Sequence, residues 1–366
     1  MTAATTAARL LPIDLLKVVA AQLIVLHHLA FYGPMADHAA VLWPALFDWL
    51  AAHARIAVQI FLVVGGFLAG QRLLPGRPPR GGLVAQGVDR YLRLALPLAG
   101  ALLVAMAGAG LARQWMVHDS IPAAPGIDQW LWHLLLLQDL VGADALSAGV
   151  WYVAIAFQLH VVLLLLVAST LSHRWTPSLA PWLLAAGVAL SALWFNRQPA
   201  WDVAAPYFLA AYGLGVLIAW SSADRSARLA CGVAIVVVAA ALAIDWRDRL
   251  GLALAVAISL GLWQINVDRR SVVGAARPSA GWLRDTISAL ARSSFALFLV
   301  HFPVALVVNA GFTRFVPADP WPQAGGVLLA WLGSVAAGEW FFRYAEHPLM
   351  RLIDRRRTRV AEPMAV

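Results

Sequence analysis

The sequence predicts an all-α, polytopic membrane protein with about ten transmembrane helices and both termini in the cytoplasm. Of its 366 residues, 61% are hydrophobic and only 13% are charged, whereas soluble domains carry roughly 25% charged residues. The mean hydropathy is +0.75. Apolar runs of about 20 residues, long enough to cross a bilayer as a helix, recur along the whole chain.

Charged residues, Pro and Gly bound these runs and set the expected helix order. The intervening polar stretches are too short for a soluble domain, so we expect one transmembrane domain over residues 1–366, with no appended soluble domain. The first run is longer than a signal-peptide core and lacks a small-residue cleavage site after it, so we expect it to be retained. The expected helices cover about 10–32, 54–74, 91–112, 150–171, 179–195, 204–220, 229–245, 250–267, 289–310 and 324–345.

The arginines predict the orientation. With the N-terminus in the cytoplasm, twenty arginines lie on the cytoplasmic side and six outside, which satisfies the positive-inside rule. Because they lie in short loops beside apolar runs, topology explains the net charge of +8 better than a nucleic-acid partner does. Residues 346–366 are then a cytoplasmic tail. The largest external loop, 113–149, contains DQWLWHLLLLQDLVG, which is too short to span and could be a re-entrant or interfacial helix.

The first span carries an unusual set of ionisable side chains. Asp14, Lys17 and His28 are three and eleven residues apart, so all three point to nearly one face of a helix, while His27 points about 100° away. Ionisable residues inside a membrane are costly and are most often functional. His28 suits a general base, because the unperturbed pKa of histidine lies near neutral pH. We interpret His27 as structural. The alternative is that Asp14 and Lys17 form an intrahelical ion pair near the cytoplasmic interface and both histidines only cap the outer helix end.

Arg90 and Arg93 open the third expected span one turn apart, a spacing that allows two guanidinium groups to hold phosphates. They could equally be positive-inside residues that reach the interface. Cys231 is the only cysteine, so neither a disulfide nor a thiolate metal site is expected, and no metal is predicted. For each of the remaining intramembrane polar residues, a hydrogen bond between helices is an adequate explanation. These residues are Gln59, Gln158, His160, His301, Glu339 and Glu346.

The motifs resemble those of the membrane-bound acyltransferase 3 family of bacterial carbohydrate O-acyltransferases. PIDLLKVVAAQLIVLHH is similar to that family's first span, LDGLRGLAALLVVLYH, with Lys17 in place of arginine. VQIFLVVGGFLAG resembles VDLFFVLSGFLI with Gln59 in place of Asp, and ALFLVHFPV resembles SLYLWHFPV around His301. WYVAIAFQLH keeps Trp151 and Gln158 of the pattern WSLSVEEQFY but lacks its acidic pair. The R-x-x-R before a proline and the closing Glu346-His347-Pro348 complete the match.

The resemblance implies transfer of an acyl group, usually acetyl, from cytoplasmic acetyl-CoA to a sugar hydroxyl facing the periplasm, in a bacterial inner membrane. Arg90 and Arg93 would bind CoA phosphates, and Lys17, held by Asp14, would line the CoA path. His28 would deprotonate the hydroxyl, although an acetyl-histidine intermediate is equally compatible. The candidates for substrate contact or for stabilising the oxyanion are His301, Gln158, Trp151 and Gln59.

The acceptor expected is an exopolysaccharide or its lipid-linked repeat unit, and next a lipopolysaccharide or a secreted glycan. Lacking a hydrolase-like domain, the chain would have to complete the transfer by itself. The main alternative is a proton-coupled transporter or flippase for a lipid-linked saccharide, in which the same ionisable residues, with Glu339, would form a proton relay. A catalytically inactive scaffold of a polysaccharide-export complex is a third reading.

Overall fold

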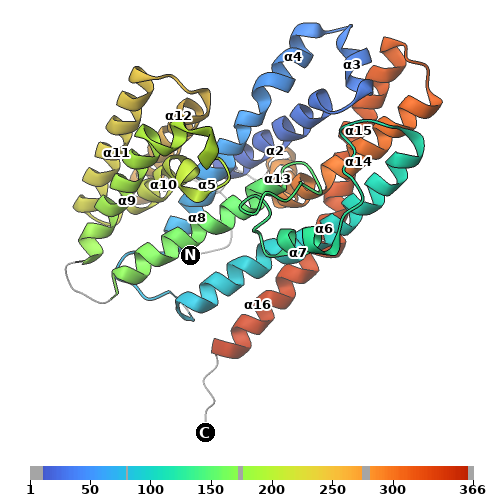
Figure 1. The fold of residues 1–366 in the computed structure, drawn as a ribbon. Helices are drawn as coiled ribbons and strands as arrows, with labels where there is room; N and C mark the ends of the chain where they lie inside the picture. The colour runs from blue at the N-terminus through green and yellow to red at the C-terminus, as the bar shows by residue number, and fades with distance from the viewer. Residues whose placement is uncertain (1–10, 80, 172–175, 274–280, 362–366) are drawn as a thin grey trace. The chain divides into compact units, whose positions relative to one another are not determined.

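The computed structural model describes residues 11–79, 81–171, 176–273 and 281–361, and every regular element within them is helical (Figure 1). The all-α prediction is confirmed. The long helices are α2 (Leu11–Phe31), α5 (Val58–Arg72), α6 (Gly82–Trp115), α8 (Val150–Ser169), α9 (Thr176–Leu193), α10 (Ala205–Trp220), α11 (Arg225–Ile244), α12 (Asp248–Val273), α14 (Ser294–Phe315) and α15 (Pro320–Phe341). The shorter ones are α3 (Pro34–Ala40), α4 (Pro44–His53), α7 (Ile127–Leu134), α13 (Trp282–Arg292) and α16 (His347–Ala361).

Nine helices in the described ranges are long and apolar enough to cross a membrane, and the expected span 204–220 is the shorter apolar helix α10. The prediction of a polytopic protein with about ten spans is therefore confirmed. Two spans begin well before their expected starts, and the span expected over 289–310 begins only at Ser294, after the separate helix α13. The candidate span Pro44–Arg72 includes α4 and the 3₁₀ turn Ala54–Ala57, and α6 already starts at Gly82. Hydropathy marks only the apolar part of a helix, whose polar turns continue beyond it.

Several connections are helical as well. Pro34 and Pro44 stand at the first positions of α3 and α4, where a missing backbone N–H costs nothing. α7 occupies the expected apolar stretch of the 113–149 loop but is only eight residues long. The region expected as a tail after residue 346 begins with α16, which follows a short π-helical segment, Phe342–Glu346.

The described residues divide into two compact units, each built from segments far apart in the sequence. The boundary passes through α2, α6, α8 and α13, so these helices contribute to both units. The first unit comprises the described parts of Met1–Lys17, Val58–Tyr91 and Ile155–Ser288, and the second those of Val18–Ala57, Leu92–Ala154 and Ala289–Val366.

In the first unit, α5 and α10 pack through glycines. A Cβ atom on Gly66 would lie 2.0 Å from the backbone oxygen of Tyr212, and one on Gly215 would lie 2.0 Å from that of Val63. Such close backbone approach is how transmembrane helices associate without a hydrophobic driving force. Trp220 fixes the end of α10, because its Nε1–H donates to the carbonyl oxygen of Leu73 at 2.9 Å.

In the second unit, α14 packs along α15, the orange pair in Figure 1. A Cβ atom on Gly338 of α15 would lie 2.7 Å from Cα of Leu297 in α14. Gly326, three turns earlier in α15, allows close contact with Met35 of α3 and with Phe312 of α14. The inner face of α14 is buried almost throughout, and this burial fixes the position of its polar side chains.

We predict that Gly66→Ala lowers the stability of the purified protein in detergent by about 1–3 kcal/mol, because the added methyl group forces α5 and α10 apart. Gly65→Ala is the matched control. Its Cβ atom would meet only Tyr212 Cε2, at 4.0 Å, and alanine gains about 1 kcal/mol over glycine in helix propensity. Thermal unfolding of both variants measures the effect. Equal stability of the two variants would contradict this packing.

Candidate active site

The two adjacent histidines of α2 have different environments, and both lie in the second unit. His27 is buried, with 6% of its surface exposed, and its Nδ1–H donates to the carbonyl oxygen of Leu50 in α4 at 3.0 Å. His28 is partly exposed. The imidazole of His27 therefore ties α2 to α4, whereas His28 is the less buried residue of the two.

His28 pairs with a histidine 273 residues further along the chain. Its Nδ1 lies 2.6 Å from Nε2 of His301 on α14, and the two rings are within 7° of parallel. His301 is completely buried. Its Nδ1 lies 2.8 Å from the carbonyl oxygen of Phe298 and 3.2 Å from that of Leu297, one turn earlier in α14.

These contacts define the tautomers of the two neutral rings. A carbonyl oxygen only accepts hydrogen bonds, so Nδ1 of His301 carries the hydrogen and Nε2 carries a lone pair. That lone pair accepts the Nδ1–H of His28. Nε2 of His28 is then left with a free lone pair, the form that a base or nucleophile requires. Both nitrogens of His301 are thereby engaged, so His301 orients His28 and has no N–H left for an oxyanion.

Packing around α14 holds this pair in place. Ser334 of α15 is buried and donates to the backbone carbonyl of Ala330 at 2.7 Å and, more weakly, to that of His301 at 3.3 Å. The ring of Phe298 lies 5.4 Å from that of Tyr152, in an edge-on arrangement, at the start of α8. Trp151 is the neighbour of Tyr152, so this sequence-predicted residue lies in the second unit, next to a side chain that covers the His301 turn.

Asn309, two turns beyond His301 on α14, anchors the chain just after His28. Its Oδ1 accepts from the backbone N–H of Met35 at 3.1 Å, and its Nδ2 donates to the carbonyl of Tyr32 at 3.3 Å. Gly33 lies against this amide with φ +101°, a conformation that disfavours any other residue. Neither Asn309 nor Ser334 belongs to the residues predicted from the sequence, although each is a polar residue in an apolar span.

Asp14 and Lys17 belong to the first unit, although they share α2 with His28. Asp14 accepts a hydrogen bond from Ser288 of α13, with 3.1 Å between the oxygens. Lys17 is partly buried on α2. The boundary between the units follows Lys17 directly, so the predicted polar stripe is divided between them.

Arg90 and Arg93 also lie on either side of this boundary, one turn apart on α6. The buried Nε of Arg90 has no hydrogen-bond partner among the described residues. Arg93 forms an ion pair with Asp354 of α16, and its Nη1 lies 3.7 Å from the sulfur of Met350. The carboxylate of Asp354 is largely exposed, at 63%. Exposed pairs of this kind are worth about 0–1 kcal/mol, so a phosphate could displace Asp354 at little cost.

The remaining predicted polar residues lie apart from the histidine pair or have structural contacts. Gln59 is buried on α5, and Gln158 accepts from the backbone N–H of Ala205 at 2.9 Å, which caps the start of α10; both lie in the first unit. Glu339 forms a 2.6 Å ion pair with Arg343 one turn later, and Glu346 is buried at the end of the π-helical segment.

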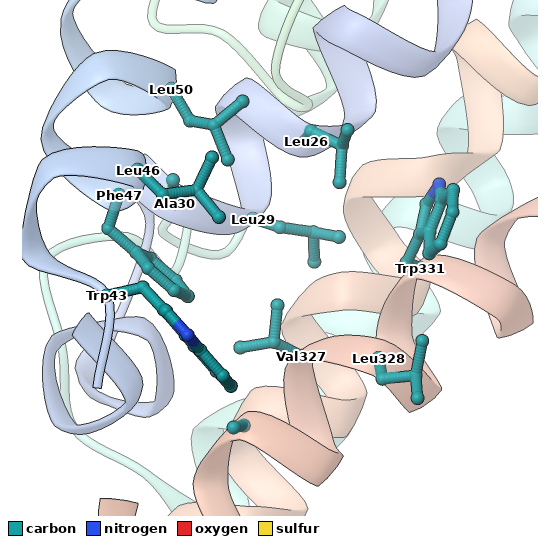
Figure 2. A pocket seen from close by; sticks show the side chains of 11 residues that line it. Leu26, Leu29, Ala30, Trp43, Leu46, Phe47, Leu50, Val327, Leu328 and Trp331 are labelled. Carbon is teal, nitrogen blue, oxygen red and sulfur yellow. The ribbon is translucent and has the colours of Figure 1, made fainter. Parts of the chain in front are cut away.

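An apolar cavity of about 190 Å³ lies between α2, α4 and α15 (Figure 2). On α2 it is lined by Leu26, Leu29 and Ala30, which occupy the helix face opposite to His28. Trp331 closes one side, and its Nε1–H donates to Gln22 at 2.7 Å. With no titratable group in its lining, this cavity is separate from the histidine pair. The described residues also contain no group of three or more His, Cys, Asp or Glu side chains placed to hold a metal ion.

The fold and this site define a multi-pass membrane protein with a hydrogen-bonded, partly exposed histidine positioned for base or nucleophilic chemistry. The chain belongs to the acyltransferase 3 family, because the family's model, described as an acyltransferase domain, matches residues 11–339. The predicted family is therefore confirmed, and the protein is a membrane acyltransferase. The match includes both His28 and His301 and ends before Glu346. Searches among curated proteins and among solved structures gave no match.

We predict that Asn309→Leu speeds hydrogen exchange at Met35 and its neighbours and lowers stability by about 1–3 kcal/mol, because a buried backbone N–H loses its acceptor. Thr313→Val, one turn later on α14, is the control. The Thr313 hydroxyl donates to a helix carbonyl at 2.8 Å, and its loss should change stability by less than about 0.5 kcal/mol. Unchanged exchange at Met35 in Asn309→Leu would show that the amide does not hold this segment.

Proposed function

We propose that the protein is an O-acyltransferase that moves an acetyl group from acetyl-CoA to a hydroxyl of an envelope or exopolysaccharide sugar, with His28 as the general base. The observation that carries this proposal is the 2.6 Å hydrogen bond between His28 and His301. Membership of the acyltransferase family supplies the reaction class, and the partial exposure of His28 supports its access to substrate.

In the proposed reaction, the acceptor hydroxyl gives its proton to Nε2 of His28 while its oxygen bonds to the thioester carbonyl carbon. His28 then carries hydrogens on both nitrogens, and its Nδ1–H still donates to His301. Collapse of the tetrahedral intermediate breaks the carbon–sulfur bond and expels the CoA thiolate, which takes the proton back from His28. The products are the acetyl ester and CoA, and His28 returns to its neutral tautomer.

Through this hydrogen bond, His301 acts as a positioning residue. It keeps the lone pair of His28 on Nε2 and accepts a hydrogen bond from the imidazolium that forms during the reaction. A carboxylate fills this place in the serine hydrolase triad, where it also holds the base in one tautomer. Here a neutral imidazole bonded to a backbone carbonyl performs the same orientation without a second charge in the membrane.

Nε2 of His28 could instead attack the thioester directly and carry the acetyl group as acetyl-histidine. Incubation of the purified protein with labelled acetyl-CoA and no acceptor separates the two routes. Label that remains on denatured wild-type protein, and is absent from His28→Ala, assigns the covalent route. Absence of label from both, with transfer intact once the acceptor is added, assigns the general-base route.

Arg90 and Arg93 are the proposed ligands of the CoA phosphates, and Lys17, with Asp14 three residues before it on α2, is proposed to line the donor path. The buried Nε of Arg90, which has no hydrogen-bond partner among the described residues, and the weak ion pair of Arg93 both support this role. We also place the termini in the cytoplasm and the protein in a bacterial inner membrane, with a carbohydrate acceptor, lipid-linked in one version, on the periplasmic side. The arginine distribution supports this orientation.

We predict that His28→Ala lowers acetyl transfer by about 10²-fold or more, because the base is lost. Mass spectrometry of envelope glycans from cells with and without the protein identifies the acceptor, and the same measurement scores the variants. His27→Ala is the matched control: it loses the bond to Leu50, which costs about 1–3 kcal/mol of stability, but it retains transfer at temperatures where it is folded. Equal loss of transfer in folded samples of both variants would overturn the assignment.

A second prediction concerns the donor. CoA should raise the thermal midpoint of the wild-type protein, and Arg93→Ala should reduce that shift. Asp354→Ala is the control, because it breaks the same ion pair but frees the guanidinium, so the response to CoA is retained or increased. If no variant and no wild-type sample responds to CoA, the transporter interpretation is favoured.

A further inference from the structure

The first unit contains a larger cavity that the proposed reaction does not use. It has a volume of about 500 Å³ and lies between α10, α11 and α12. Its lining comprises Ile218 of α10 with Ser221 and Ser222 directly after that helix, Arg228, Cys231, Gly232 and Ile235 of α11, and Ile258, Gly261, Leu262, Gln264 and Ile265 of α12. The lining residues of α11 recur at helical spacing and therefore share one face of that helix. The volume falls within the range of small-molecule sites.

One end of this cavity is polar. Arg228 is exposed and supplies a positive charge in the first turn of α11. Gln264 donates through Nε2 to the hydroxyl of Ser222 at 2.8 Å. Its Oε1 is buried and has no hydrogen-bond partner among the residues that the structure describes. This end therefore presents one cation and one unused acceptor.

The other end is apolar. Arg228 and Ile235 are seven residues apart on α11, so the cavity extends about 10 Å along the helix from its charged end. Ile258 lies at the same distance from Ile265 on α12, and the lining beyond the polar end is aliphatic apart from the Cys231 thiol. Gly232 keeps the cavity open, because no atom lies within 4 Å of where its Cβ would be.

We propose that this cavity binds one anionic glycerophospholipid of the surrounding bilayer, with its phosphate at Arg228 and an acyl chain along Ile235 and Ile258. A headgroup hydroxyl, as in phosphatidylglycerol, would donate to Oε1 of Gln264. The charge of Arg228 complements the phosphate, and the aliphatic lining matches the chain. On the positive-inside rule, this is a lipid of the cytoplasmic leaflet. The proposal stands independently of the acyl-transfer reaction.

Native mass spectrometry of the full chain tests this proposal, with phosphatidylglycerol and phosphatidylcholine of identical acyl chains offered together. One basic residue near a membrane surface is worth about 1 kcal/mol, so we expect the wild-type protein to retain phosphatidylglycerol about fivefold in preference. Arg228→Gln should remove the preference and leave chain binding intact. Arg225→Gln, one turn earlier on α11 and outside the lining, should retain the preference.

A second variant tests the apolar end. Gly232→Leu places a side chain in the cavity from a Cβ position that has no atom within 4 Å, and leucine raises helix propensity. The protein should therefore fold and lose bound lipid of both kinds. Gly325→Leu on α15, which also faces open space, is its control and should bind like the wild-type protein. The proposal is wrong if the wild-type protein retains both lipids equally, or if Arg228→Gln and Gly232→Leu bind like their controls.

Discussion

One hydrogen bond, between Nδ1 of His28 and Nε2 of His301, underlies both the packing and the proposed chemistry of the second unit. It joins α2 to α14 across 273 residues of sequence, and with the Phe298 carbonyl it leaves each ring a single neutral tautomer. Within the low dielectric of a membrane protein, such a bond is strong and an unpaired imidazole would be costly. The same contact thus reduces the cost of burying two imidazoles in an apolar span. It also leaves on Nε2 of His28 the lone pair that the proposed acyl transfer needs.

Neighbouring helices of the second unit fix the positions of these two rings. Backbone contact at Gly338 brings α15 against α14, where Ser334 reaches the His301 turn. Asn309 fixes the chain beyond α2, and His27 fixes α2 to α4. A base acts efficiently only if its orientation is set before the substrate arrives. Several modest interactions, each worth about 1 kcal/mol, supply that orientation from three neighbouring helices.

Much of the fold can be predicted from the sequence, because a lipid environment permits few backbone structures. The helices α2, α8 and α10 coincide closely with the predicted apolar runs. Helical periodicity also predicts that the side chains of His27 and His28 point in different directions, because adjacent residues on one helix are about 100° apart. Contacts between helices could not be predicted in the same way. Nothing in the local sequence shows that His301 meets His28, or that Arg93 meets Asp354, because that depends on which helix faces pack together. Pro34 and Pro44 indicate the starts of α3 and α4, because proline is favoured at the first position of a helix. A search for membrane-spanning runs does not use this indication.

The tautomer of His28 decides whether this hydrogen bond orients the ring as a base. Nitrogen-15 spectra of histidine-labelled protein in lipid, at a pH where the rings are neutral, report which nitrogen of each imidazole carries hydrogen, and comparison with His28→Ala assigns the signal. We expect a protonated Nδ1 on His28, an Nε2 without hydrogen, and a coupling across the hydrogen bond to Nε2 of His301. A hydrogen on Nε2 of His28, with no coupling between the two rings, would contradict this expectation.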